Sequence, residues 1–229
     1  MNFKFHPDFR LRKLKIGREE APLVVIDSLL AGAEELVDIA ATKMFSDVVT
    51  YYPGVRSKVP LTYQQFVIEQ LRDVFAGYFG LSGGTLRFTA CHFSLVTTPP
   101  QKLAHLQSIP HIDSTAASEL AFVHYLFKSD LGGTSFYRHR ATGFEYIDDA
   151  RAPRYWSVVD EEKAGPHSPK AGYISGDTPL YERIGHQDGV FNRILIYRRN
   201  SLHSGALGSN FVPDLNPRTG RLSINGFLA

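Results

Sequence analysis

Short apolar runs broken by glycine and proline fill residues 86–229 and constrain the fold more than any other feature of the sequence. The runs are rich in valine, isoleucine, phenylalanine, threonine and tyrosine, a composition typical of antiparallel strands. They follow the pair Gly83-Gly84 and cover residues 86–96, 118–127, 133–139, 191–199 and 221–228. Several such strands in one unit predict a barrel or jelly roll, because these architectures protect or remove sheet edges.

Helical periodicity is confined to the N-terminal part of the chain. Apolar residues recur at helical spacing over 33–44 and again within 62–81, which predicts helices with one buried face. We therefore expect a mainly β fold with flanking helices (α+β) in a single domain, 1–229. Residues 1–85 form strand and helical support packed on one sheet. Residues 86–229 form the jelly-roll core, with a polar insertion, rich in glycine and proline, at about 143–190.

Composition narrows the classes of function. The 229 residues are 43% hydrophobic and 12% aromatic, enough to bury a sizeable core. Twenty-five basic against twenty-three acidic side chains leave a formal charge of +2, too small to indicate a nucleic-acid or membrane partner. The sequence shows neither a signal-peptide pattern nor a long apolar stretch, and its single cysteine, Cys91, fits a reducing compartment as a small apolar filler. We expect a cytoplasmic protein.

Three His-x-Asp triplets occur in the chain. On a strand, residues i and i+2 point to the same side, so each triplet would place an imidazole beside a carboxylate. A third metal ligand is available in His203, which follows the apolar run 194–197. The triplets are His6 with Asp8, His111 with Asp113, and His186 with Asp188.

Position along the chain separates these triplets. The first precedes every strand of the predicted core, and Asp188 lies only fifteen residues before His203, which leaves too little chain for the strands between two halves of a site. We therefore expect His111, Asp113 and His203 to bind the metal. Two histidines and one carboxylate on one face of an ion leave its other positions open, as in non-haem Fe(II) oxygenases.

The order of three short motifs resembles the Fe(II) and 2-oxoglutarate dependent dioxygenases. These are "HID" at 111–113, "LHSG" at 202–205 and "GRLSING" at 220–226. Residues 22–40 and 122–140 are similar to the prolyl-hydroxylase-like branch of this superfamily. In all, the resemblance covers about residues 22–45 and 86–229, whereas 46–85 match only as generic helix and loop.

The resemblance implies a double-stranded β-helix, the cupin-like form of the jelly roll, with Fe(II) as cofactor and 2-oxoglutarate as co-substrate. Arg221 and Ser223 would bind the distal carboxylate of 2-oxoglutarate, and Tyr125 would hydrogen-bond it from the opposite strand. Arg221 falls eighteen residues beyond His203, a longer gap than the family leads us to expect. Arg218 is closer but lies in a Pro-Arg-Thr-Gly turn, so we prefer Arg221.

The expected reaction is hydroxylation of an amino acid, peptide or other small metabolite, because the carboxylate ligand Asp113 leaves no vacancy for a halide. Arg140 and Trp156 are candidate substrate contacts, although a solvated strand face and an anchor for the insertion explain them as well. Tyr125 is equally compatible with a core aromatic. Two other classes fit the same residues: a cupin-like metal enzyme that does not use 2-oxoglutarate, and a non-catalytic ligand-binding barrel.

Overall fold

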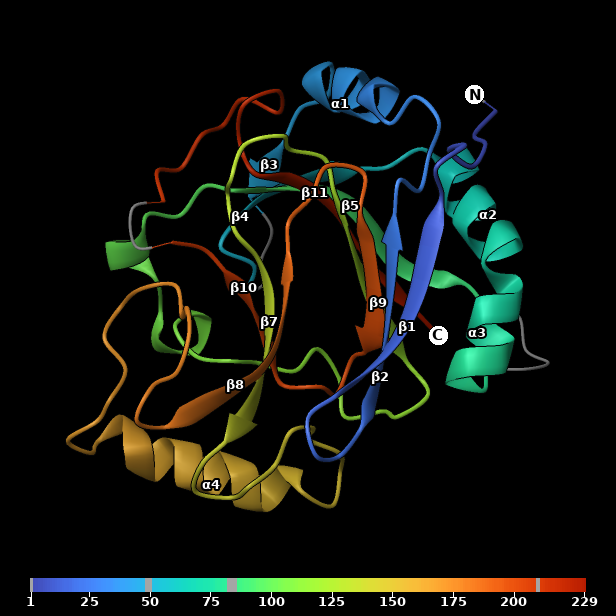
Figure 1. Cartoon of the computed structure of the whole chain (residues 1–229). Helices are drawn as coiled ribbons and strands as arrows, with labels where there is room; N and C mark the ends of the chain where they lie inside the picture. The colour runs from blue at the N-terminus through green and yellow to red at the C-terminus, as the bar shows by residue number, and fades with distance from the viewer. Residues whose placement is uncertain (1, 48–50, 82–85, 209–210) are drawn as a thin grey trace.

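Two antiparallel sheets form the body of the protein (Figure 1). The computed structural model describes residues 2–47, 51–81, 86–208 and 211–229, so the pair Gly83-Gly84 lies outside the described residues. The large sheet has the order β1 (Arg10–Ile16), β2 (Ala21–Asp27), β9 (Ile194–Arg198), β6 (Leu120–Tyr125), β11 (Leu222–Leu228), β5 (Phe88–Val96), β4 (Gly54–Lys58), β3 (Ser46–Asp47). The small sheet has the order β10 (His203–Ala206), β7 (Gly133–His139), β8 (Tyr181–Asp188).

Helices cover the outer faces of both sheets. They are α1 (Glu34–Ala41), α2 (Leu61–Gln70), α3 (Arg72–Phe79) and α4 (Ala152–Lys163). Figure 1 shows α2 and α3 beside β1 and β2, and α4 along the lower edge beside β8. The apolar run predicted as one helix over 62–81 is divided into α2 and α3 at Leu71, where the backbone leaves helical geometry (φ −104°, ψ 12°).

The large sheet is buried on both faces, which explains the unbroken apolar run of β2. Val24 and Ile26 pack outward against side chains of α1, α2 and α3. Leu23 and Val25 pack inward in a cluster that includes Phe136 of the small sheet. A strand covered on both sides has no solvated face and therefore shows no polar alternation.

Two parts of the segment 143–190, α4 and β8, contribute to the fold. Tyr155 and Val159 of α4 pack against Tyr137 and Tyr181 on the outer face of the small sheet. The segment ends in β8, which pairs with β7 along its length.

Neither β8 nor β10 was predicted from the sequence. The expectation of a mainly β fold with flanking helices is confirmed. Within the described ranges, none of the helices has the length and apolar character needed to cross a membrane.

A buried polar network fastens α2 to the large sheet. The Tyr63 hydroxyl lies 3.0 Å from His124 Nδ1, and His124 Nε2 lies 3.2 Å from Asn192 Oδ1. The amide oxygen accepts, so Nε2 carries the proton and Nδ1 accepts from tyrosine. Asn192 in turn exchanges two hydrogen bonds with the backbone of Leu30, at 3.0 and 2.8 Å. Burial lowers the pKa of His124 to about 4, so the imidazole is neutral at neutral pH.

This network predicts a pH dependence of stability. Because the pKa of His124 is lower in the folded than in the unfolded chain, its contribution is complete above pH 6.5 and is lost progressively as the pH falls toward 4. Between pH 7 and pH 5 the wild type should therefore lose about 2 kcal/mol more unfolding free energy than His124→Gln. Urea unfolding of both proteins measures the difference. His6→Gln, at a partly exposed histidine, should keep the wild-type slope; equal slopes for all three would contradict this account.

Candidate metal centre and its cavity

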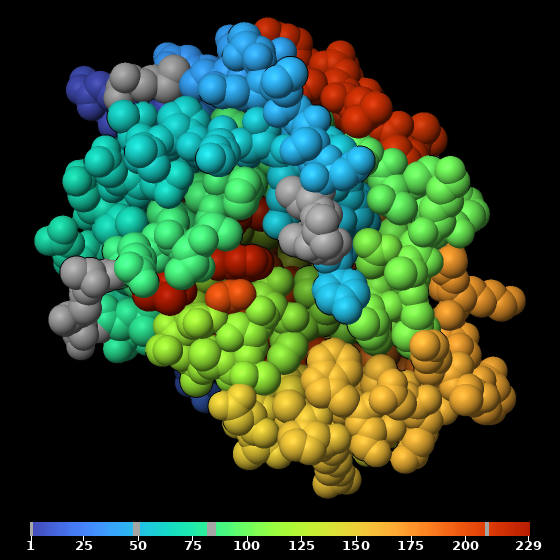
Figure 2. All heavy atoms as spheres, turned by 180° about the vertical axis from the view of Figure 1, so that it is seen from behind, coloured from blue at the N-terminus to red at the C-terminus, as the bar shows by residue number. Residues whose placement is uncertain are grey.

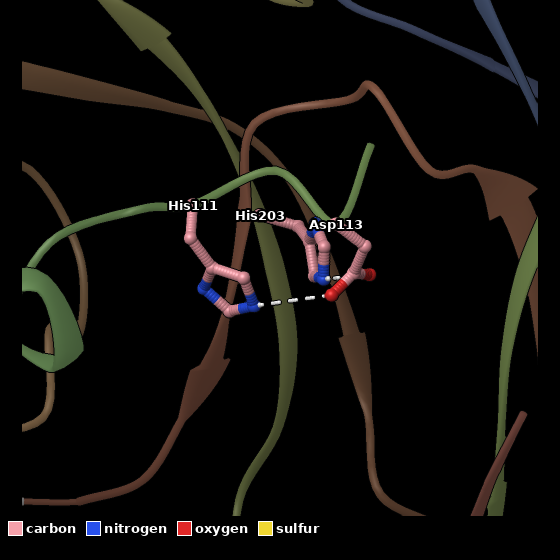
Figure 3. A group of neighbouring side chains, drawn as sticks. All are labelled: His111, Asp113 and His203. Atoms are coloured by element: carbon pink, nitrogen blue, oxygen red, sulfur yellow. Dashed lines mark ion pairs between the residues drawn. The ribbon is translucent and has the colours of Figure 1, made fainter. Parts of the chain in front are cut away.

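His111, Asp113 and His203 converge (Figure 3). Each offers a ligand atom, and these atoms lie within 4.8 Å of one another. The two oxygens of Asp113 divide between the histidines, with Oδ1 4.0 Å from His111 Nε2 and Oδ2 3.5 Å from His203 Nε2. The two rings have centroids 4.4 Å apart. Of the three triplets in the sequence, this one therefore has a third ligand beside it.

Backbone pairing brings the three residues together. The His111 N–H donates to the His203 carbonyl at 2.9 Å, and the His203 N–H donates to the His111 carbonyl at 3.0 Å. This antiparallel bridge extends the small sheet beyond β10 by one residue pair. Asp113, two residues further on, donates its N–H to the Arg199 carbonyl at 2.8 Å. The loop that carries His111 and Asp113 is thereby attached to the ends of both β9 and β10.

Arg199 completes that attachment. Its Nη2 donates to the Asp113 carbonyl at 2.9 Å, and its Nη1 pairs with Glu119 Oε2 at 2.5 Å. The guanidinium also lies 4.1 Å from the centroid of the Phe227 ring. Arg199 thus holds the backbone of Asp113 from two directions and orients its carboxylate without touching it.

One hydrogen bond fixes a proton on His203. Its Nδ1 lies 2.9 Å from the Ser201 carbonyl oxygen, which can only accept, so Nδ1 carries a proton and Nε2 faces Asp113. The His111 side chain lies at the cavity wall and is 46% exposed. Burial and the neighbouring His203 lower the pKa of His111 to about 4. Two imidazoles and one carboxylate are a donor set that suits a divalent first-row metal.

A cavity of about 590 Å³ opens at this centre. Its wall includes all three candidate ligands, two arginines (Arg56 and Arg221) and several aromatic rings. Figure 2 shows a hollow on the face opposite that of Figure 1, with red atoms of the C-terminal part of the chain at its edge. Among described residues, the cavity joins the metal cluster to Arg221 in one space.

Arg221 is held in place by backbone carbonyls. Its Nε donates to Leu131 O and its Nη2 to Gly133 O, each at 2.9 Å, and the residue is only 6% exposed. These bonds leave Nη1 uncommitted on a side chain that lines the cavity. Arg218 instead forms an exposed ion pair with Asp38 at 2.5 Å and is not a lining residue.

The two polar partners predicted for Arg221 lie behind the cavity wall. The Tyr125 hydroxyl is 2.7 Å from Thr134 Oγ1, and Ser223 Oγ donates to Asn225 Oδ1 at 2.8 Å. Tyr125 and Ser223 are fully buried and do not line the cavity, whereas Thr134 and Asn225 do. Asn225 follows Ser223 by two residues on the same strand face, so the alternation that indicated Ser223 could also have indicated Asn225.

The predicted substrate contacts occupy different places. Trp156 lines the cavity from α4 and is 37% exposed, while its neighbour Tyr155 is buried beneath the helix. Arg140 is outside the cavity lining, where it pairs with Asp177 at 3.5 Å and donates to the Thr178 carbonyl at 3.0 Å. The structure gives no support for a substrate role of Arg140.

The sequence analysis did not predict most of the lining residues, and three of them have informative contacts. Tyr197 packs edge-on against His203 with ring centroids 4.8 Å apart. Tyr173 lies in the loop after α4 and donates its hydroxyl to Thr98 O at 2.7 Å. Arg56 belongs to β4, a strand whose short polar sequence gives no strong strand signal. These residues meet only through tertiary packing.

The other histidine triplets are local. Asp8 donates its N–H to His6 Nδ1 at 3.0 Å near the N-terminus. His186 lies between Ser135 Oγ at 2.9 Å and Asp188 Oδ1 at 3.0 Å. Ser135 is fully buried and none of these residues lines the cavity. The arrangement on β7 and β8 therefore stabilises the small sheet and does not form an accessible nucleophile.

Removing a metal ligand should abolish divalent-metal binding. Asp113→Asn or His203→Ala should weaken Mn(II) or Co(II) binding by more than about 100-fold, because loss of an outer partner alone typically costs 10–100-fold. Isothermal titration calorimetry measures the affinity. Asp188→Asn is the matched control, since this carboxylate follows a histidine at the same spacing but is 82% exposed. Retained affinity in Asp113→Asn would contradict the assignment.

Arg199→Met should weaken metal binding about tenfold or more with all three ligands intact, because it frees the backbone of Asp113. The same titration measures it. Arg12→Met is the control, an arginine of β1 that forms an ion pair with Asp27 at 3.4 Å and lines no part of the cavity. If Arg199→Met bound Mn(II) as tightly as the wild type, neither the hydrogen bond of Arg199 to the Asp113 carbonyl nor its ion pair with Glu119 would contribute to the metal centre.

The chain resembles known proteins in fold but not closely in sequence. No curated protein sequence matches the chain. The solved structure of the non-heme alpha ketoglutarate dependent carbocyclase SnoK from nogalamycin biosynthesis has a TM-score of 0.52 at 11% identity, covering 92% of this chain and 80% of that one. At this identity the likeness shows a shared fold.

Two further solved structures overlap less closely. The non-heme alpha ketoglutarate dependent epimerase SnoN has a TM-score of 0.46 at 14% identity, covering 90% of this chain and 77% of its own. HygX from Streptomyces hygroscopicus, with nickel and 2-oxoglutarate bound, has a TM-score of 0.48 at 12% identity, covering 92% and 84%. A family model described as "Family of unknown function (DUF6445)" matches residues 7–228. Because this match spans almost the whole chain, the protein belongs to that family.

Proposed function

We propose that this protein is a non-haem Fe(II) and 2-oxoglutarate dependent oxygenase of the prolyl-hydroxylase-like branch, with its two sheets forming a double-stranded β-helix. The observation that carries the proposal is the convergence of two histidines and one carboxylate in a cavity that also contains the anchored Arg221. The fold shared with SnoK, whose description names alpha ketoglutarate dependence, supports it.

The residues have separate roles in this proposal. His111, Asp113 and His203 would hold Fe(II) through Nε2 of each imidazole and the carboxylate, with the remaining positions directed into the cavity. Bound iron and 2-oxoglutarate supply the oxidative chemistry, in which dioxygen is consumed, succinate and carbon dioxide are released and the substrate is oxidised. The protein contributes position and the exclusion of bulk water.

Arg221 would bind the distal carboxylate of 2-oxoglutarate. The carbonyls of Leu131 and Gly133 fix its guanidinium, so little side-chain freedom is lost on binding and Nη1 is available to the ligand. Tyr125 and Ser223 would act through the residues that they contact, Thr134 and Asn225, which reach the cavity. Hydroxylation of an amino acid, peptide or other small metabolite, with Trp156 at the substrate end, is the reaction we propose.

One observation favours a second candidate. The two hydrogen bonds of Arg221 to backbone carbonyls are also what a purely structural arginine would make. In that case the protein is a cupin-like metal enzyme that does not use 2-oxoglutarate. The two functions differ in whether Arg221 contributes to binding a dicarboxylate.

Arg221→Met should weaken 2-oxoglutarate binding to the Mn(II)-loaded protein at least tenfold, about the loss expected for a charge-assisted hydrogen bond. Mn(II) affinity should be unchanged. Calorimetry measures both constants, and succinate release under air with Fe(II) and ascorbate should fall in parallel. Arg218→Met is the matched control, because this arginine is nearby in sequence but outside the cavity.

Equal 2-oxoglutarate affinity in the wild type and Arg221→Met would move the assignment to the cupin-like enzyme. Absence of both metal and 2-oxoglutarate binding in the wild type would favour a non-catalytic barrel.

A further inference from the structure

A second arginine lines the cavity from another strand of the large sheet. Arg56 of β4 lies opposite Ser94 of β5, which lies opposite Ser223 of β11. Residues directly opposite in a ladder share a sheet face, so Arg56 is on the inner face. Its neighbour Val55 packs outward against the apolar core, as alternation requires.

Arg56 has no hydrogen-bonded or ionic partner within the part of the chain that the structure describes. No carboxylate lies within 4.0 Å of its guanidinium, and its buried Nε donates no hydrogen bond. The residue is half-buried and lines the cavity, with Cζ 4.3 Å from the centroid of the Tyr52 ring. Stacking on an aromatic ring fixes the plane of a guanidinium and leaves its edge free for ligands.

The surrounding charges do not neutralise Arg56. Lys58 lies two residues on along the same strand, and the imidazole of His92 lies opposite Lys58. Asp113 is close enough for its charge to raise the pKa of Arg56, although burial lowers that pKa overall. When a metal occupies the centre, this carboxylate is committed to the ion. A half-buried cation without a partner is unfavourable unless a ligand supplies the opposite charge.

The rest of the cavity wall defines what accompanies that charge. Among the aromatic rings that line it, Tyr52 precedes β4, Trp156 belongs to α4, and Tyr173 follows α4. A volume of about 590 Å³ is in the range of pockets that hold a drug-sized ligand. The charge of Arg56 and these rings together suit a molecule with one anionic group on an apolar or aromatic body.

We propose that Arg56 binds a carboxylate of the substrate, so that the substrate is an organic acid with an apolar or aromatic body. The assignment of this ligand as substrate rests on the proposed function, whereas the carboxylate site does not. Arg221 and Arg56 then divide the anions, the first taking the co-substrate and the second the substrate. The planar guanidinium would pair with the carboxylate through two parallel hydrogen bonds.

Binding to metal-free protein tests the site independently of iron and 2-oxoglutarate. The probes are three matched pairs: phenylacetate, 4-phenylbutanoate and N-acetyl-L-phenylalanine, each with its primary amide. In EDTA, saturation-transfer NMR and calorimetry should show the wild type binding the acids at least about tenfold more tightly than the amides. Arg56→Met should abolish the preference and Arg56→Lys should retain part of it. Arg221→Met should keep it.

Arg87→Met is the control, because Arg87 is exposed and outside the cavity lining. Circular dichroism and thermal unfolding establish that each variant is folded, and Arg56→Lys keeps the test valid if the methionine variant is not. The proposal is overturned if the wild type shows no preference in any pair, or if the preference persists in Arg56→Met.

A second arm separates substrate from co-substrate. With Mn(II) bound, Arg56→Met should leave 2-oxoglutarate affinity within about threefold of the wild type, since the proposal gives that ligand to Arg221. A collapse of 2-oxoglutarate affinity in Arg56→Met would overturn the division. If the acids bind at Arg56 but no succinate is ever formed, the oxygenase assignment fails and the carboxylate site stands.

Discussion

The reciprocal backbone hydrogen bonds between His111 and His203 are the interaction on which the rest of the site depends. They join a loop that precedes β6 to the first residue of β10, two segments far apart in the sequence. The ladder does so because each bond removes a buried polar group from an unsatisfied state. Asp113 lies two residues after His111, and Arg199 holds its backbone through a hydrogen bond to its carbonyl.

The inner face of the large sheet has two halves that differ in polarity. Toward β2 and β9 the face is apolar, with Leu23, Val25 and Leu195 packed against the small sheet. Toward β4, β5 and β11 it is polar, and there the cavity lies. The outer face is largely apolar and carries α1, α2 and α3. The apolar half of the inner face therefore stabilises the fold, and the polar half is available to ligands.

Sequence reasoning recovered the parts of this structure that are encoded locally. An apolar strand buried on two faces, such as β9, stands out as a continuous run. The edge strand β8 does not, because most of its side chains are partly exposed and polar. Order along the chain alone separated His111 and Asp113, the candidate metal ligands, from the two other His-x-Asp triplets, and the structure brings them together with His203.

What the sequence could not supply is contact between distant segments. Whether a polar residue on a strand reaches a cavity depends on which layer covers it: Asn225 reaches the cavity, whereas Ser223 on the same face is buried. Arg140 looked equivalent to a binding residue until its ion pair with Asp177 was located. Arg56 drew no attention in the sequence and became informative only because its guanidinium, among the residues that the structure describes, has no hydrogen-bonded or ionic partner.

The most direct test of the central claim is the visible absorption spectrum of the anaerobic Fe(II) protein as 2-oxoglutarate is added. Chelation of the iron by the co-substrate predicts a saturable metal-to-ligand charge-transfer band in the wild type and none in Asp113→Asn. A wild-type protein that binds Fe(II) tightly but develops no band at saturating 2-oxoglutarate would contradict the account.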